Sequence, residues 1–376
     1  MIGIIVHASA QISLSIVNQF TEDKPTNVYV TGVDSNNNWV LLQPDGTWYH
    51  PNPQSITPVP ITAGIELPVG KPGTTTTFNL PGYISSGRVW VAAGTLAFYA
   101  YENFGVVTLI QPSVIDNPAT KYDFIEFSNI ESDGLFVNLS YVDFVGLTLA
   151  ISVKSADGSV QTAPGFGTAA CKQICSQLQI VETDQPWDKL CVTDAANDII
   201  RIFSPSTYIS LDPSAFQGYY TNYVDNIWTT YNSRPLIIDT EGPAGKIQCT
   251  TAGNILNCEN SSRNYAKPTA ADIFSCSTGP FTIDASDNSI HLAVVPRLCA
   301  AFQRSTLSLE GGNTQPNLES TSYYTISPTN YYSKYVHSHE TDGKGYAFPY
   351  DDVKESQSGL IYSKEPKELK ITVTEC

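Results

Sequence analysis

Short segments in which apolar and polar residues alternate fill the first 165 residues, and they constrain the fold more than any other feature. Residues 12–17 (ISLSIV) and 27–32 (NVYVTG) are examples, and turn signals such as the Pro-Asp-Gly at 44–46 separate the segments. An alternation of period two fits a half-buried β-strand, and regularly spaced turns are typical of antiparallel sheets. The pattern therefore predicts a mainly β protein, with a β-sandwich or flattened barrel over residues 11–165.

Helix signals replace the alternating segments after residue 165. Residues 213–231 place aromatic and apolar side chains on one helical face, and Asp212 is the expected cap. Two further helices are expected at residues 294–304 and 328–337. A chain of 376 residues is long enough for two hydrophobic cores. The sequence therefore predicts a second unit of α/β type.

The last residues of the chain return to a strand-like pattern. Residues 346–350 and 369–373 are the expected strands. We expect them to rejoin the first unit. The predicted organisation is a β domain made of residues 11–165 plus 340–376, with an α/β domain of residues 166–339 inserted into it.

The eight cysteines all lie between Cys171 and Cys376. Their number is even and they show no paired CxxC spacing of metal ligands, so disulfides in an oxidising compartment are expected, together with secretion to the cell exterior. The pairing stays open, although Cys249 and Cys258 would close a short loop. The first 170 residues must be stabilised by burial rather than by cross-links.

The N-terminal residues 1–10 allow two interpretations. An apolar run followed by small residues resembles the remnant of a secretory leader, yet the same run fits a first β-strand. The chain contains no run of about 18 apolar residues, so no membrane-spanning helix is predicted.

The charge balance argues against a nucleic acid partner. The formal net charge is -16, and no cluster of Lys and Arg offsets it. An uncharged polysaccharide meets no such repulsion, and 21 Tyr and 5 Trp offer flat apolar faces to sugar rings. Most of these aromatic residues can equally be ordinary β-sheet residues.

Two carboxylates follow one predicted hairpin. Alternation along residues 122–127 (YDFIEF) places Glu126 beside an aromatic residue, and Asp143 follows the second arm, residues 135–142. Burial beside an aromatic ring would raise the pKa of a carboxyl. A protonated and an ionised carboxyl are what glycoside hydrolysis requires.

Four segments resemble landmarks of the thaumatin superfamily, in the same order. Residues 86–90 (SGRVW) are similar to its SGRxW strand. The pair Glu126-Phe127 followed by residues 138–146 (NLSYVDFVG) is similar to its EF strand and DVSxVDGFN segment. Residues 345–352 (GYAFPYDD) resemble its AYxYAxDD segment near the C-terminus.

The chain length and the ending from His337 to Val353 are similar to glycoside hydrolase family 64, which comprises β-1,3-glucanases. The resemblance implies a thaumatin-like β domain beside an α/β domain, with a wide acidic groove between them. It implies an inverting endo-type reaction on β-1,3-glucan, with Glu126 as general acid and Asp143 as general base. An inverting pair needs about 6.5–9.5 Å between its carboxyl groups, and about 5 Å would imply a retaining nucleophile.

Residues around the pair are expected to contact the sugar. Asn138 stands where thaumatins carry an acidic residue, so we expect it to contact sugar through its amide. Arg88, Tyr122, Ser128 and Tyr141 are the other expected substrate contacts.

Other conspicuous residues have plainer interpretations. Asn138 and Asn260 both begin glycosylation sequons, and Asn260 is the better acceptor because a glycan at Asn138 would obstruct the groove. His337 and His339 are expected at the surface, without a metal. Trp90 is expected in the core.

Two other classes of protein remain open at this stage. A non-catalytic, antifungal β-glucan-binding protein would use the same groove without needing two opposed carboxylates. A structural cell-surface protein would need neither groove nor paired acids. We expect a monomeric hydrolase that uses no cofactor.

Overall fold

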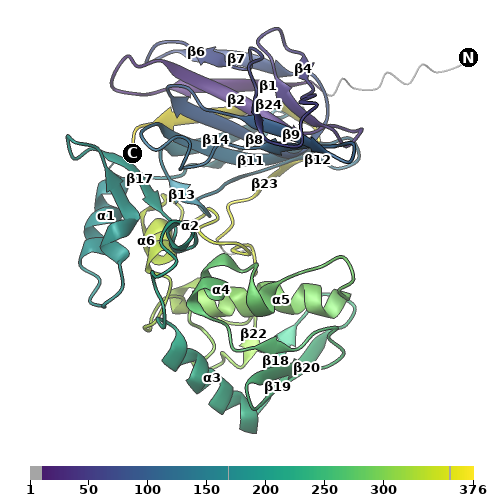
Figure 1. Ribbon diagram of the computed structural model, residues 1–376, viewed down its shortest axis with the longest axis vertical. Coiled ribbons are helices and arrows are strands. Elements are labelled where there is room, and N and C mark those ends of the chain that lie inside the picture. Colours follow the sequence, from purple (N-terminus) through teal and green to yellow (C-terminus); the bar gives the residue numbers. More distant parts are fainter. Residues whose placement is uncertain (1–10, 168, 355–356) are drawn as a thin grey trace, which may run out of the picture.

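The computed structural model describes residues 11–167, 169–354 and 357–376 (Figure 1). The predicted leader or first strand at residues 1–10 lies outside these described residues. Two layers of sheet form one end of the molecule, and helices with a smaller sheet form the other (Figure 1).

Two sheets pack face to face in the β-sandwich. The five-stranded sheet consists of β15 (Val160–Ala163), β14 (Thr148–Ser155), β24 (Pro366–Thr374), β1 (Ile12–Asn18) and β7 (Thr75–Leu80), in that order. The larger sheet consists of β23 (Ile361–Ser363), β12 (Gly134–Leu139), β11 (Lys121–Ile130), β8 (Ile84–Ala93), β2 (Thr26–Val33), β3 (Trp39–Leu42) and β4 (Trp48–Tyr49), with β6 (Leu67–Val69) paired to β2. A small third sheet holds β10 (Val106–Ile110), β9 (Tyr99–Asn103) and β5 (Val59–Pro60).

The C-terminal strand β24 lies between β14 and β1, which confirms that the last residues return to the first sheet. The strand predicted at residues 346–350 is wrong. Tyr346 makes only an isolated bridge to Ser140, and the residues after it form turns. The reason is the buried carboxylate of Asp351, which accepts a hydrogen bond from the Ala347 N–H at 2.9 Å and so fixes a turn.

The second region carries the helices. Its helices are α1 (Ala170–Gln179), α2 (Pro205–Leu211), α3 (Thr221–Ser233), α4 (Ala270–Ser275), α5 (Ser289–Gln303) and α6 (Tyr331–His339), with short 3₁₀ turns at Trp187–Leu190, Gly279–Phe281 and Ser320–Ser322. One sheet there orders β21 (Tyr265–Ala266), β20 (Ile255–Cys258), β19 (Lys246–Ala252), β18 (Leu236–Asp239) and β22 (Thr314–Gln315). Another joins β13 (Phe144–Val145), β17 (Ile199–Phe203) and β16 (Cys191–Thr193).

The single helix predicted over residues 213–231 is wrong in its first half. Phe216 and Gly218 adopt positive φ angles of 57° and 77°, and this left-handed backbone interrupts a helix. Asp212 ends α2 instead of starting the next helix. The helix predicted at 294–304 begins earlier, because the Asn288 side chain caps α5.

All eight cysteines form disulfides, which confirms that prediction. The pairs are Cys171–Cys376, Cys175–Cys191, Cys249–Cys258 and Cys276–Cys299. The expected short loop between Cys249 and Cys258 is among them. Within the described residues, no helix combines the length and apolarity needed to cross a membrane.

Candidate active site

One face of the larger sheet opens into a groove. In the register of the sheet, Glu126 on β11 lies opposite Arg88 on β8 and Asn138 on β12. Side chains that face each other across neighbouring strands lie on the same side of a sheet. They border a hollow of about 340 Å³ whose lining also includes Trp39, Gln111, Ser128 and Phe136.

Arg88 organises the floor of this groove. Its Nη2 and Nε donate to Glu126 Oε1 at 2.9 and 3.2 Å, and its Nη1 donates to Gln111 Oε1 at 2.7 Å. The guanidinium carbon lies 4.4 Å from the ring centre of Phe124, the neighbour of Glu126 along the same face. The Glu126 side chain stays 36% exposed. The carboxylate is therefore held in place but remains accessible.

Asp143 is positioned by the loop between β12 and β13. Its carbonyl accepts a hydrogen bond from the Ser204 N–H at 3.0 Å. The buried carboxylate of Asp123 accepts from the N–H groups of Gly146 and Leu147 at 2.9 and 3.2 Å, which fixes the turn after Asp143. Only glycine fits at 146, because a Cβ there would lie 2.1 Å from the Tyr122 carbonyl oxygen.

The two carboxylates interact electrostatically. Burial raises the pKa of Asp143, the positive charge of Arg88 lowers it, and the negative charge of Glu126 raises it. Asp143 and Glu126 therefore share one electrostatic environment with Arg88 between their influences. In the free protein Asp143 is the carboxyl whose protonated form burial favours, whereas Glu126 is ion-paired with Arg88. This runs opposite to the acid and base roles that the sequence resemblance implies.

The structure brings four of the five predicted substrate contacts or their neighbours to different places. Arg88, Ser128 and Asn138 line the groove with Glu126. The prediction for Tyr122 and Tyr141 is wrong, because both side chains are only 1% exposed.

Each of the two tyrosines is covered by residues distant in sequence. Tyr122 shares the face of Glu126 but lies under Phe144, 5.1 Å between ring centres, and under the guanidinium of Arg201. Tyr141 stacks on Phe166 at 4.5 Å. Neither ring can reach a sugar in the groove. Trp90 is 1% exposed, which confirms its predicted place in the core.

The sequence analysis missed three groove residues. Phe136 shares the face of Asn138 two residues away, so the alternation of β12 carried the signal. Trp39 begins a strand that the sequence predicted, but nothing local showed that it borders the groove. Gln111 follows β10 and reaches Arg88 only through the tertiary fold.

The surface position predicted for His337 is wrong. It is buried between two carboxylates, with Nδ1 3.0 Å from Glu340 Oε2 and Nε2 2.8 Å from Asp351 Oδ2. Burial opposes its charge, but Asp351 and Glu340 together raise the pKa of His337 to about 10. Asp351 also pairs with the buried Arg304 at 2.9 Å. His339 is half-buried and contacts Gln177.

The described part of the chain contains no group of three or more His, Cys, Asp and Glu side chains placed to hold a metal ion. The groove instead combines two carboxylates with aromatic and amide side chains, a combination suited to neutral sugars. The fold and site together define the class of glycoside hydrolases.

A family model described as beta-1,3-glucanase, glycoside hydrolase family 64, matches residues 10–373. The chain therefore belongs to glycoside hydrolase family 64, as its sequence motifs predicted.

Curated relatives agree with this membership. Proteins named glucan endo-1,3-beta-glucosidase from Arthrobacter sp. (strain YCWD3) and from Cellulosimicrobium cellulans are each 26% identical over 382 residues. The match covers 98% of this chain, and the chain spans 66% of the length of each relative.

Solved structures share the fold. A laminaripentaose-producing beta-1,3-glucanase in complex with laminaritetraose superposes with a TM-score of 0.85 at 22% identity, covering 97% of this chain and 99% of the other. A beta-1,3-glucanase domain from Clostridium beijerinckii gives a TM-score of 0.76 at 18% identity, covering 97% and 98%. The overall chain path is thus shared across the family despite low identity.

Proposed function

We propose that this protein is a secreted endo-type β-1,3-glucanase that cleaves laminarin-type glucan in the groove between Trp39 and Phe136. Family membership supports the substrate, and the relatives named glucan endo-1,3-beta-glucosidase support endo cleavage. The observation that carries the proposal is the placement of Glu126 in an accessible groove within the electrostatic influence of Asp143.

The chemistry that we propose is inverting hydrolysis. Glu126 donates a proton to the glycosidic oxygen, and Asp143 removes a proton from a water that attacks the anomeric carbon from the opposite face. A sugar bound over Glu126 would exclude water from this half-exposed carboxyl and favour its protonated form. Arg88 then stabilises the carboxylate that remains after the proton has left.

The first experiment measures sugar release from laminarin by the wild type and by Glu126→Gln and Asp143→Asn. Each variant should lose about 100- to 10,000-fold in kcat, because a positioned acid or base contributes that much. Asp133→Asn, an exposed acid in the turn after β11, is the matched control and should keep full activity. Wild-type binding to laminarin without sugar release would instead favour a non-catalytic glucan-binding protein.

A second experiment assigns the two roles. With a substrate whose leaving group needs no protonation, such as a dinitrophenyl laminarioside, Glu126→Gln should regain activity and Asp143→Asn should not. Recovery of Asp143→Asn alone would reverse the roles, in line with the electrostatics of the free protein. The anomer released first, followed by NMR, tests inversion.

We further propose a thaumatin-like β domain and a monomer that acts outside the cell on cell-wall polysaccharide. Four disulfides support an oxidising compartment. Recovery of the disulfide-bonded protein from the culture medium tests the location. Light scattering in solution tests the monomer, and a mass of twice 40.9 kDa would contradict it.

A further inference from the structure

The groove does not end at Ser128. Strand β11 keeps an unbroken register with β12 from Ile125 to Ile130, so Glu126, Ser128 and Ile130 face the same side. Ile130 is 37% exposed, which is unusual for an isoleucine inside a sheet pair. Its side chain lies about 13 Å beyond Glu126, at about 3.3 Å per residue. The face that carries the catalytic pair thus continues outward along β11.

Two further hollows begin where this row of side chains ends. One of about 330 Å³ and one of about 550 Å³ share Tyr83, Asn129, Ile130 and Glu131 in their linings. We call the two together the Tyr83 pocket. The larger hollow includes Ser85, whose neighbour Ser86 lines the groove at Glu126. Hollows therefore follow the β8–β11 strand pair from the groove to the end of the sandwich.

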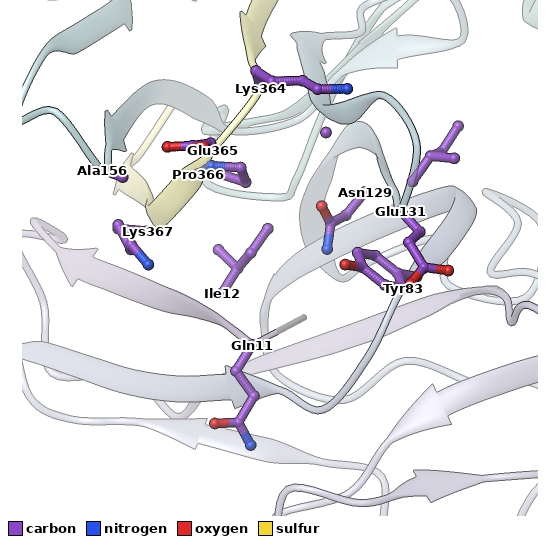
Figure 2. Close-up of a pocket in the computed structure, with 12 residues that line it drawn as sticks. Gln11, Ile12, Tyr83, Asn129, Glu131, Ala156, Lys364, Glu365, Pro366 and Lys367 are labelled. Carbon is purple, nitrogen blue, oxygen red and sulfur yellow. The ribbon is translucent and has the colours of Figure 1, made fainter. Parts of the chain in front are cut away.

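The lining of the Tyr83 pocket mixes an aromatic ring with polar groups. Figure 2 shows Tyr83, Asn129 and Glu131 along one side of the smaller hollow, with Pro366 and Lys367 from β24 on the other. Carboxylate and amide groups bind hydroxyls, and a half-buried tyrosine ring offers a flat face to a pyranose ring. Acidic and basic side chains are both present, so the pocket suits a neutral, hydroxyl-rich ligand rather than an anion.

We propose that the Tyr83 pocket binds a distal stretch of the same β-1,3-glucan chain that the groove cleaves, with the chain passing over Ser128 and Ile130. This rests on the proposed function. A polymer that already occupies the groove reaches the pocket at high effective concentration, because the two sites lie on one strand face. The pocket therefore favours long chains over short ones.

The test measures KM and kcat for laminarioligosaccharides of increasing length. Tyr83→Ala should raise the KM for laminarin by up to about tenfold, because a ring contact contributes about 0.5–1.5 kcal/mol. The KM for the shortest cleaved chains and the kcat should stay unchanged, since the lost contact lies far from the scissile bond. Tyr83→Phe should restore the wild-type KM.

Two further variants separate a binding role from a structural one. Glu131→Ala removes an exposed hydroxyl acceptor and should also raise the KM for long chains only. Tyr101→Ala, a comparably half-buried tyrosine on β9 outside the pocket, should have no effect. Unchanged KM values for long chains in both Tyr83→Ala and Glu131→Ala would overturn the proposal. So would a shift in oligomeric state on Tyr83→Ala with glucan affinity unchanged, because the occupant would then be a second copy of the chain.

Failure of the proposed function gives a different result. Affinity electrophoresis in a gel containing laminarin measures binding without turnover, and we would use the Glu126→Gln protein as the background. If the wild type releases no sugar, Tyr83→Ala in this background still tests the pocket: weaker retardation supports it, and equal retardation rejects it.

Discussion

The β-sandwich and the region between residues 166 and 339 are stabilised by different means. The first 165 residues contain no cysteine, and long strands such as β8 and β11 bury apolar side chains between two sheets. The other region has short strands and helices, and three disulfides lie inside it. Long strands bury enough surface to leave one sheet face open. The sandwich can therefore carry an exposed polar groove without cross-links.

The two regions are joined by covalent and ionic contacts. The Cys171–Cys376 disulfide ties α1 to the residues after β24. The bridge between Phe166 and Glu340 brings in the carboxylate that holds His337. The difference between the regions teaches that the junction, rather than either core, is where single changes should affect both.

Removing the disulfide at the junction should have the largest effect on stability. The Cys171→Ser, Cys376→Ser double variant opens a loop of 205 residues, and the chain-entropy model gives a loss of about 5 kcal/mol for loops of this length. Urea unfolding followed by tryptophan fluorescence measures it. Equal unfolding midpoints for variant and wild type would show that burial alone holds the two regions together.

Breaking the buried ion cluster should come next. His337→Ala leaves Glu340 and Asp351 without their shared cation and should cost about 3–5 kcal/mol. His339→Ala, which removes one half-buried contact to Gln177, should cost about 1 kcal/mol or less. Similar losses in the two variants would contradict the role of the buried charge.

The pH dependence gives an independent check on His337. Its pKa is raised from 6.5 to about 10 in the folded protein, so its stabilising contribution is complete below about pH 6.5 and is lost as the pH rises through 10. The difference in unfolding free energy between wild type and His337→Ala should therefore shrink from pH 6.5 to 10. A constant difference would show that the imidazole acts by packing alone.

A disulfide inside the second region should matter less. The Cys276→Ser, Cys299→Ser double variant opens a loop of 23 residues and should cost about 3 kcal/mol. Laminarin hydrolysis below the unfolding transition should be unchanged, because the groove lies on the sandwich. A large fall in kcat without unfolding would show that the two regions are coupled more closely than their cross-links suggest.

The sequence predicted the sandwich because alternation is a local signal with period two, and residues 12–17 and 27–32 form strands as expected. It could not place the break before α3. The left-handed backbone at Phe216 depends on its packing against Trp187, 4.7 Å between ring centres, and that contact spans distant residues. Local apolar spacing carries no information about such contacts.

The same limit applies to the site. Arg88, Glu126 and Asn138 meet because strand register and alternation follow from the sequence pattern. Tyr122 shares that face, but Phe144 and Arg201 cover it, and neither is a strand neighbour. Burial of a side chain on a sheet face depends on what the rest of the chain lays over it.

The smallest effect we predict compares one ion pair in each region. Arg88 lowers the pKa of Asp143, so Arg88→Gln should move the limb of the kcat/KM–pH profile that reports Asp143 to higher pH, by about one unit or less. Arg263 likewise holds the pKa of Asp287 at about 2, but in the second region. Arg263→Gln should therefore leave both limbs in place. A shift of the same limb by both variants would mean that net charge, rather than the Arg88 contact, sets the activity profile.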